Sequence, residues 1–227
     1  MREKCHFDRS DNLAKFSPCQ YFGESADTAI YGNSHAVELG YGIAEVLKKK
    51  SRSIAHFSIS GCAPGFRNEA DRYCDDFYQK NLRTIIQDNK IKYVILAYRA
   101  ENSGQVGAKS IVELANYLSG LDKKVLLVLQ APTLPRDINF YLKQSFASHK
   151  GSIISRSRNE WNNINKAIYS ALMGIDPKIK VIDPSNYFCD AHNCYAIKDR
   201  NALYFDDNHM SIFGARLISE DIVDHLN

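Results

Sequence analysis

The sequence predicts an α/β protein in which helices cover both faces of a parallel β-sheet. From residue 28 onward, short apolar segments alternate with segments of helical periodicity, which is the order of consecutive βαβ units. Two of the apolar segments, residues 93–97 and 125–129, are continuous, as strands buried on both faces require. We therefore expect a three-layer α/β/α sandwich with a five-stranded parallel sheet.

Five apolar segments account for the expected strands. The first, residues 28–31, leads into the turn Gly32-Asn33-Ser34, and the second, residues 53–58, ends shortly before Gly61. Three more strands are expected over residues 93–97, 125–129 and 180–183.

Apolar residues spaced three and four positions apart predict the helices between these strands. The first helix places Val37, Tyr41, Ala44 and Leu47 on one face. The last helix begins at Ser211, a residue type that caps helix N-termini. Further helices are expected over residues 75–89, 108–121 and 159–173.

Two segments lack this periodicity. Residues 1–27 are expected to form an extended lead-in that packs on a body formed by residues 28–227. Residues 131–156 contain Pro132 and Pro135 and show little periodicity, so we expect a long loop there. Loops of this length in compact domains usually act as lids or binding loops.

The composition excludes several classes of function. The formal net charge is +3 and no long basic run occurs, so nothing indicates a nucleic-acid partner. No apolar stretch approaches the roughly 18 residues that span a bilayer, so the domain itself is not expected to cross a membrane. The first residues are polar and show no signal peptide, so we expect that the targeting segment lies elsewhere.

The six cysteines fall into three local pairs that bracket turn-rich stretches. Six cysteines allow 15 pairings, so spacing alone does not prove the connectivity. Local disulfides are the simplest arrangement, and they would place the chain in an oxidising compartment outside the cytosol. A zinc site with His6 and His192 is an alternative that lacks a C-x-x-C spacing, and reduced cysteines in a cytosolic protein are another. The expected disulfides are Cys5–Cys19, Cys62–Cys74 and Cys189–Cys194.

Ligands of open parallel sheets bind beyond the carboxyl ends of the strands, so residues at these ends are the candidates for function. Ser34 lies where a strand turns into a helix, although a serine at this position is commonly just a helix cap. Asp206 and His209, three residues apart before the last helix, have the types needed to activate a serine. Each of these residues has an ordinary structural explanation when it is considered alone.

The ordered set of motifs resembles a known family. These motifs are Gly32-Asn33-Ser34-His35-Ala36, Cys62-Ala63-Pro64, the loop from Cys189 to Cys194, and a final block over residues 204–215 with Asp206-x-x-His209. They resemble the SGNH, or GDSL, hydrolase superfamily, and are most similar to the SGNH domains fused to acyltransferase-3 membrane domains in bacterial envelope O-acetyltransferases. The similarity runs from about residue 5 to the end.

The resemblance implies a flavodoxin-like fold and a role for each matching residue. Ser34 would be the nucleophile, His209 the general base and acid, and Asp206 the residue that orients His209. The backbone N–H groups of Ser34 and Gly61 would form the oxyanion hole. The implied chemistry needs no cofactor and no metal.

Two departures from the family pattern affect the expected site. Asn33 replaces the usual aspartate, which removes a charge but keeps a similar hydrogen-bonding geometry. The Gly-x-Asn block after the third strand, whose asparagine donates to the oxyanion, has no clean equivalent here. Arg99 and Asn102 are the candidates for this third donor, and Arg99 is equally well explained as an ion-pair partner.

The resemblance also implies a function and a location. We expect O-acetylation of an envelope glycan, such as lipopolysaccharide O-antigen, through an acyl-enzyme. The acetyl donor would be delivered by an acyltransferase-3 membrane domain of the same polypeptide, which would tether this periplasmic domain to the inner membrane. A carbohydrate esterase with the same triad and a catalytically idle glycan-binding module are the alternatives.

The expected loop over residues 131–156 begins at the carboxyl edge of the sheet. We therefore predict that it forms part of the acceptor surface, where Arg136, Asn139, Tyr141 and Lys143 would contact the glycan.

Overall fold

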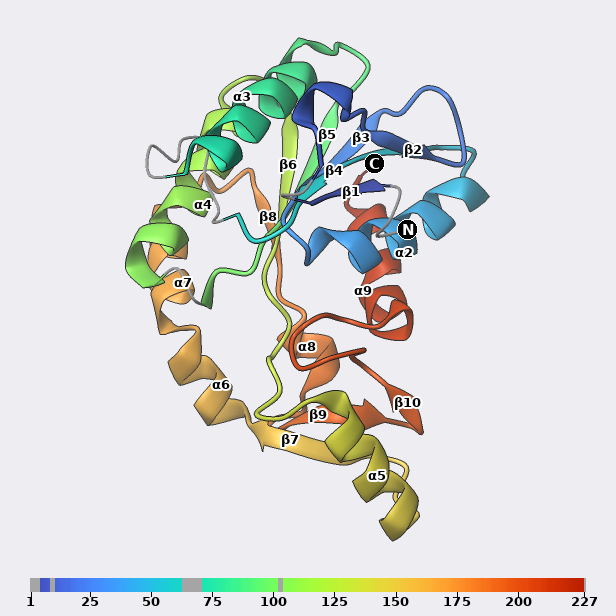
Figure 1. Cartoon of the computed structure of the whole chain (residues 1–227). Coiled ribbons are helices and arrows are strands. Elements are labelled where there is room, and N and C mark those ends of the chain that lie inside the picture. Colours follow the sequence, from blue (N-terminus) through green and yellow to red (C-terminus); the bar gives the residue numbers. More distant parts are fainter. Residues whose placement is uncertain (1–4, 9–10, 63–70, 102–103, 227) are drawn as a thin grey trace.

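The computed structural model describes residues 5–8, 11–62, 71–101 and 104–226. Its main sheet carries helices on both faces, and a smaller sheet lies beyond one end of it together with α5 (Figure 1). The described helices are α2 (Ala36–Lys49), α3 (Arg72–Gln87), α4 (Gly104–Ser119), α5 (Ile138–Ser148), α6 (Arg158–Ile164), α7 (Lys166–Ala171), α8 (Ser185–Phe188) and α9 (Ile212–Asp224), with 3-10 turns η1 (Leu13–Lys15) and η3 (Leu172–Gly174).

The main sheet contains all five predicted strands, and they are parallel, in the order β4-β3-β5-β6-β8. The sheet has seven strands rather than the predicted five, because β1 and β2 of the lead-in both pair with β4. Its strands are β1 (His6–Phe7), β2 (Cys19–Tyr21), β3 (Thr28–Gly32), β4 (Ile54–Ile59), β5 (Tyr93–Ala97), β6 (Lys124–Val128) and β8 (Lys180–Ile182).

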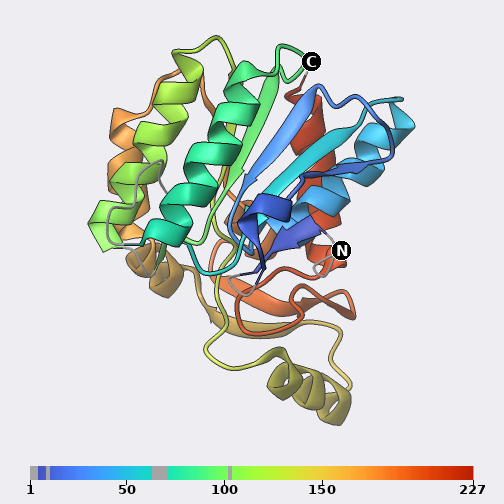
Figure 2. The ribbon, with the colours of Figure 1, turned by 45° about the horizontal axis from the view of Figure 1, so that its top comes forward.

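Alternating side chains of the central strands point into two separate cores. Ile30 of β3 and Ile95 of β5 pack with side chains of α2 and α9 on one face. Their neighbours Tyr31 and Leu96 pack with α3, α4 and α7 on the other face. Figure 2 shows these three helices together on that face of the sheet. This period of two, with both faces covered, explains why these strands read as continuous apolar segments.

The prediction of one long loop over residues 131–156 is wrong. This segment contains α5 and β7 (Ile153–Ser157), and β7 pairs with β9 (Asn193–Lys198), which pairs with β10 (Asn201–Ala202). Only Ile138 and Tyr141 of α5 are buried, so its sequence lacks the apolar periodicity of a helix packed along its whole length.

The predicted helix over residues 159–173 is also interrupted. It is divided into α6, α7 and the turn η3. Asn165 ends α6 and begins α7 with a ψ of 7°, outside the helical range, and its side chain is buried. A break at one residue does not disturb the spacing of apolar residues enough to be read from sequence.

Three disulfide bonds connect the predicted pairs of cysteines. Cys5–Cys19 joins the residue before β1 to β2, and Cys62–Cys74 joins the turn after β4 to α3. Cys189–Cys194 joins the end of α8 to β9. All six cysteines are therefore paired, which leaves no thiolate for the alternative zinc site. Within the described ranges, no helix has the length and apolar character needed to cross a bilayer.

Peptide mapping under non-reducing conditions is expected to recover these three pairs and no others. Each bond closes a short loop, and restricting the unfolded chain in this way stabilises a protein by roughly 2–3 kcal/mol per bond. Reduction should therefore lower the melting temperature without any change of sequence. Recovery of a crossed pair, such as Cys74 with Cys189, would contradict the assigned connectivity.

Candidate active site

The turn after β3 brings the first candidate residues to the carboxyl edge of the sheet. Gly32 is required there, since a Cβ at this position would lie 1.9 Å from the carbonyl oxygen of Ala97 on β5. Ser34 follows in the turn that leads into α2. The cap residue of α2 is His35, which makes no side-chain capping bond, so Ser34 is not held in place by a capping role.

Asn33 links this turn to the end of the neighbouring strand. Its buried Oδ1 atom accepts hydrogen bonds from the backbone N–H of His35 at 3.1 Å and of Arg99 at 3.3 Å. An aspartate could accept the same two bonds, which explains in geometric terms why asparagine can stand at this position.

We expect Asn33→Ala to lower the free energy of unfolding by about 2 kcal/mol, because two backbone donors, one buried and one partly buried, lose their acceptor. Asn33→Asp retains the acceptor atom and is expected to stay close to the wild type. Urea unfolding of the two variants measures the difference. Equal stability of Asn33→Ala and Asn33→Asp would contradict the bridging role.

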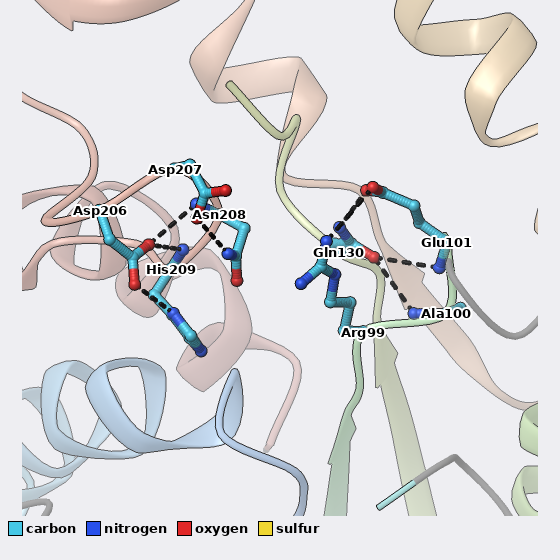
Figure 3. Close-up of polar contacts among 8 residues, drawn as sticks. All are labelled: Arg99, Ala100, Glu101, Gln130, Asp206, Asp207, Asn208 and His209. Atoms are coloured by element: carbon cyan, nitrogen blue, oxygen red, sulfur yellow. Dashed lines mark hydrogen bonds and ion pairs between the residues drawn. The ribbon is translucent and has the colours of Figure 1, made fainter. Parts of the chain in front are cut away.

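Asp206 and His209 meet in the turn that precedes α9. Oδ1 of Asp206 accepts hydrogen bonds from the backbone N–H groups of Asn208 at 2.8 Å and His209 at 2.7 Å (Figure 3). Oδ2 of Asp206 lies 2.6 Å from Nδ1 of His209. The carboxylate therefore fixes both the backbone of the turn and the orientation of the imidazole ring.

The structure brings Ser34 to the other nitrogen of the same ring. Oγ of Ser34 lies 2.8 Å from Nε2 of His209, although the two residues are 175 positions apart in the sequence. With Asp206 accepting from Nδ1–H, the neutral ring offers Nε2 as an acceptor for the serine hydroxyl. Two further rings contact His209: Phe205 stacks on it at 5.4 Å and His35 packs against it at 4.5 Å between centroids.

The hydrogen bonds to Asp206 keep its carboxyl group ionised. Burial by itself would raise the pKa of Asp206, but the bonds from the backbone N–H groups of His209 and Asn208 and from the His209 ring lower this pKa below its ordinary value. The ionised carboxylate therefore stabilises the fold above the pKa of an unfolded aspartate. This contribution is lost as the pH falls through the lowered folded-state pKa.

Gly61, the second predicted oxyanion donor, follows β4 with a φ of 66°, a left-handed conformation that favours glycine. The lead-in supports this turn, because His6 contacts the hydroxyl groups of Ser58 at 2.7 Å and Ser60 at 2.8 Å. The backbone N–H of Ser60 also donates to the carbonyl of Phe7. His6 is thus a structural support of the turn rather than a metal ligand.

Arg99, a candidate third oxyanion donor, belongs to a cluster that follows β5 (Figure 3). Its Nη2 atom lies 3.4 Å from Oε1 of Glu101. Oε1 of Gln130 accepts from the backbone N–H groups of Ala100 and Glu101, and its amide donates to Glu101 at 2.7 Å. Sequence reasoning missed Gln130, a buried residue after β6. The other candidate donor, Asn102, lies outside the described residues.

Three of the four predicted acceptor residues are exposed, and the fourth, Tyr141, is buried. The side chain of Tyr141 is only 4% exposed and packs in the hydrophobic core on the buried side of α5. Arg136 lies 4.4 Å over the ring of Phe140, while Asn139 and Lys143 are exposed. Tyr141 is therefore a packing residue, and its predicted contact with a glycan is wrong.

Tyr141→Ala is expected to lower the free energy of unfolding by about 3 kcal/mol, since truncating a buried aromatic side chain leaves a cavity. Lys143→Ala on the exposed part of the same helix is the matched control and should stay within about 0.5 kcal/mol of the wild type. Thermal melting of both variants provides the measurement. A Tyr141→Ala variant as stable as Lys143→Ala would mean that α5 is not anchored through this residue.

Comparison with known proteins identifies one matching family and two solved structures with a similar fold. The sequence profile described as SGNH domain (fused to AT3 domains) matches residues 4–224. No curated protein matches the sequence significantly.

The fold is similar to two solved structures. One is the periplasmic domain of a lipopolysaccharide acetyltransferase from Salmonella ser. Paratyphi A, with a TM-score of 0.72 and 12% identity over 98% of this chain and 91% of that domain. The other is a carbohydrate acetylesterase family member from Sinorhizobium meliloti, with a TM-score of 0.51 and 12% identity over 88% of this chain and 99% of that protein. The α/β/α fold implied by the motifs is therefore confirmed.

Proposed function

Because the chain belongs to the family of SGNH domains that are fused to AT3 domains, we propose that it transfers an acetyl group to a hydroxyl group of a bacterial envelope glycan. A lipopolysaccharide O-antigen or a related polysaccharide is the proposed acceptor. The observation that carries this proposal is the chain of hydrogen bonds from Ser34 Oγ through His209 to Asp206 at the carboxyl edge of the sheet, which we call the relay.

In the first half of the proposed reaction, Ser34 attacks the carbonyl carbon of the acetyl donor. His209 Nε2 takes the hydroxyl proton as the C–O bond between Ser34 Oγ and the carbonyl carbon forms, and Asp206 stabilises the imidazolium. The backbone N–H groups of Ser34 and Gly61 would hold the negative oxygen of the tetrahedral intermediate. His209 then gives the proton to the leaving group, and an acetyl-enzyme remains on Ser34.

In the second half, a sugar hydroxyl takes the place of the leaving group. His209 removes its proton, the sugar oxygen attacks the acetyl carbonyl, and collapse of the intermediate returns the proton to Ser34 Oγ. The products are an O-acetylated sugar and the free enzyme. In this proposal, an AT3 membrane domain of the same polypeptide delivers the acetyl donor and tethers the domain, whose three disulfides fit an extracytoplasmic location.

A carbohydrate esterase is the second candidate, since water can attack the same acetyl-enzyme. The similarity of the fold to a carbohydrate acetylesterase family member supports this second candidate. Incubation with p-nitrophenyl acetate and a mixture of methyl glycosides, followed by mass spectrometry, separates the two activities. An acetylated glycoside supports transfer, whereas acetate as the only product supports the esterase.

An idle glycan-binding module is the remaining alternative. The relay argues against it, because packing alone does not require a serine, a histidine and a carboxylate in mutual contact. A serine-directed fluorophosphonate is expected to label Ser34 in the folded domain. A folded sample that takes up no label would support the idle module.

A further inference from the structure

His35 is a buried histidine whose place in the fold is not explained by helix formation. It is only 6% exposed, and it begins α2 without making a side-chain capping bond. Its ring instead packs against the ring of His209, with 4.5 Å between centroids and 32° between the planes. The residue that follows Ser34 in the sequence thus contacts the residue that receives the Ser34 proton.

Two buried polar atoms beside the relay make no hydrogen bond of normal length and angle with any residue that the structure describes. These are Nε2 of His35 and Oδ1 of Asn208, and both residues are more than nine-tenths buried. Asn208 precedes His209 in the sequence, and its amide nitrogen donates a hydrogen bond to the side chain of Asp207. Buried polar atoms without partners are rare in folded proteins, so two of them around one catalytic histidine call for a functional reason.

The surroundings of His35 keep its ring neutral. Burial lowers the pKa of His35 well below its ordinary value, and the positive charges of His209 and Arg99 lower it further. The Asn208 side chain, which lies within reach of the ring as a hydrogen-bond partner, and the negative charge of Asp206 both raise the pKa of His35, but they are outweighed. A neutral His35 does not place a second positive charge against His209 when that ring is protonated, and it retains an N–H group to donate.

We propose that His35 is a positioning residue for His209: its ring supports the His209 ring, and its Nε2–H donates to Oδ1 of Asn208 during acylation. This bond would tie the turn over residues 206–209 to the turn that carries Ser34. Hydrogen bonds in catalytic sites are often long or poorly aligned in the free enzyme and tighten when the substrate binds, which accounts for two atoms without a well-formed bond to the described residues. The inference rests on the proposed function of the same site.

The test uses His35→Phe, which keeps a ring of similar size but removes the nitrogen atoms, and Asn208→Leu, which removes the acceptor. With p-nitrophenyl acetate as substrate, each variant is expected to lower kcat by about 10- to 100-fold through displacement of His209, with little change in KM. If both act through one bond, the double variant should be scarcely worse than either single variant. Should His35→Phe fail to fold, Asn208→Leu tests the same bond alone.

Two controls separate this bond from general damage to the turns. Asp207→Ala removes the partner of the Asn208 amide nitrogen but leaves Oδ1 in place, and His192→Ala removes an exposed histidine. Both are expected to keep wild-type kcat. Losses that multiply in the double variant, an unchanged kcat in Asn208→Leu, or an effect confined to KM would overturn the proposal. Hydrolysis that survives in Ser34→Ala would instead reject the proposed function itself.

Discussion

Replacing Ser34 by alanine is expected to lower acyl transfer by about 10⁵-fold or more, because the acetyl-enzyme forms on this hydroxyl group. His209→Ala should be nearly as damaging, since a serine hydroxyl without a base is a poor nucleophile at neutral pH. Because the two residues act as a unit, the double variant should be scarcely slower than either single one. Steady-state hydrolysis of p-nitrophenyl acetate measures all three.

Loss of activity in these variants should not reflect loss of the fold. Ser34 does not cap α2, so Ser34→Ala is expected to change the free energy of unfolding by less than about 1 kcal/mol. Circular dichroism and a thermal melt check this point. If Ser34→Ala retained more than a few per cent of the wild-type rate, the serine mechanism would have to be abandoned.

Replacing Asp206 by alanine is expected to lower kcat by roughly 10³- to 10⁴-fold, less than the loss at Ser34, because the carboxylate orients and stabilises His209 without taking the proton. It should also reduce stability, since two backbone N–H groups of the turn lose their acceptor. Parallel measurements of kcat and of urea unfolding distinguish the two effects.

Asp207 provides the matched control for this experiment. It is adjacent in the sequence, and its side chain contacts Asn208 rather than the His209 ring. Its carbonyl group accepts from the backbone N–H of Leu134, a bond that survives substitution of the side chain. Asp207→Ala is therefore expected to keep most of the activity. A larger loss here than in Asp206→Ala would show that the wrong carboxylate had been assigned.

The strands of the main sheet could be predicted because local sequence determines them. Residues 93–97 and 125–129 are apolar without interruption, and the structure places β5 and β6 there in the middle of the sheet. The second sheet could not be predicted in this way. β7 pairs with β9 across about forty residues with irregular register, and only part of β7 is buried, so neither strand has a clear alternating pattern.

The residues of the relay were found through motifs, not through geometry. Nothing in the sequence shows that Ser34 and His209 are in contact, and the motifs became informative only as an ordered set. The supporting roles of His6 and Gln130 could not be predicted, because each acts through contacts with distant segments. His6 contacts Ser58 and Ser60, and Gln130 contacts the residues that follow β5. Such supporting residues carry no local signature, since their role exists only after the strands have paired.

The outer strands of the main sheet are short, which affects how copies of this domain meet. At one edge of the sheet, β8 has three residues. At the other edge, β1 has two residues and β2 has three residues. A strand edge of this length offers another chain few free backbone donors and acceptors, and Lys180 adds an exposed charge to β8. Among the described strands, the longer edge strand β7 is irregular in register, which also hinders pairing. Edge-to-edge aggregation is thereby disfavoured even where many copies are crowded together.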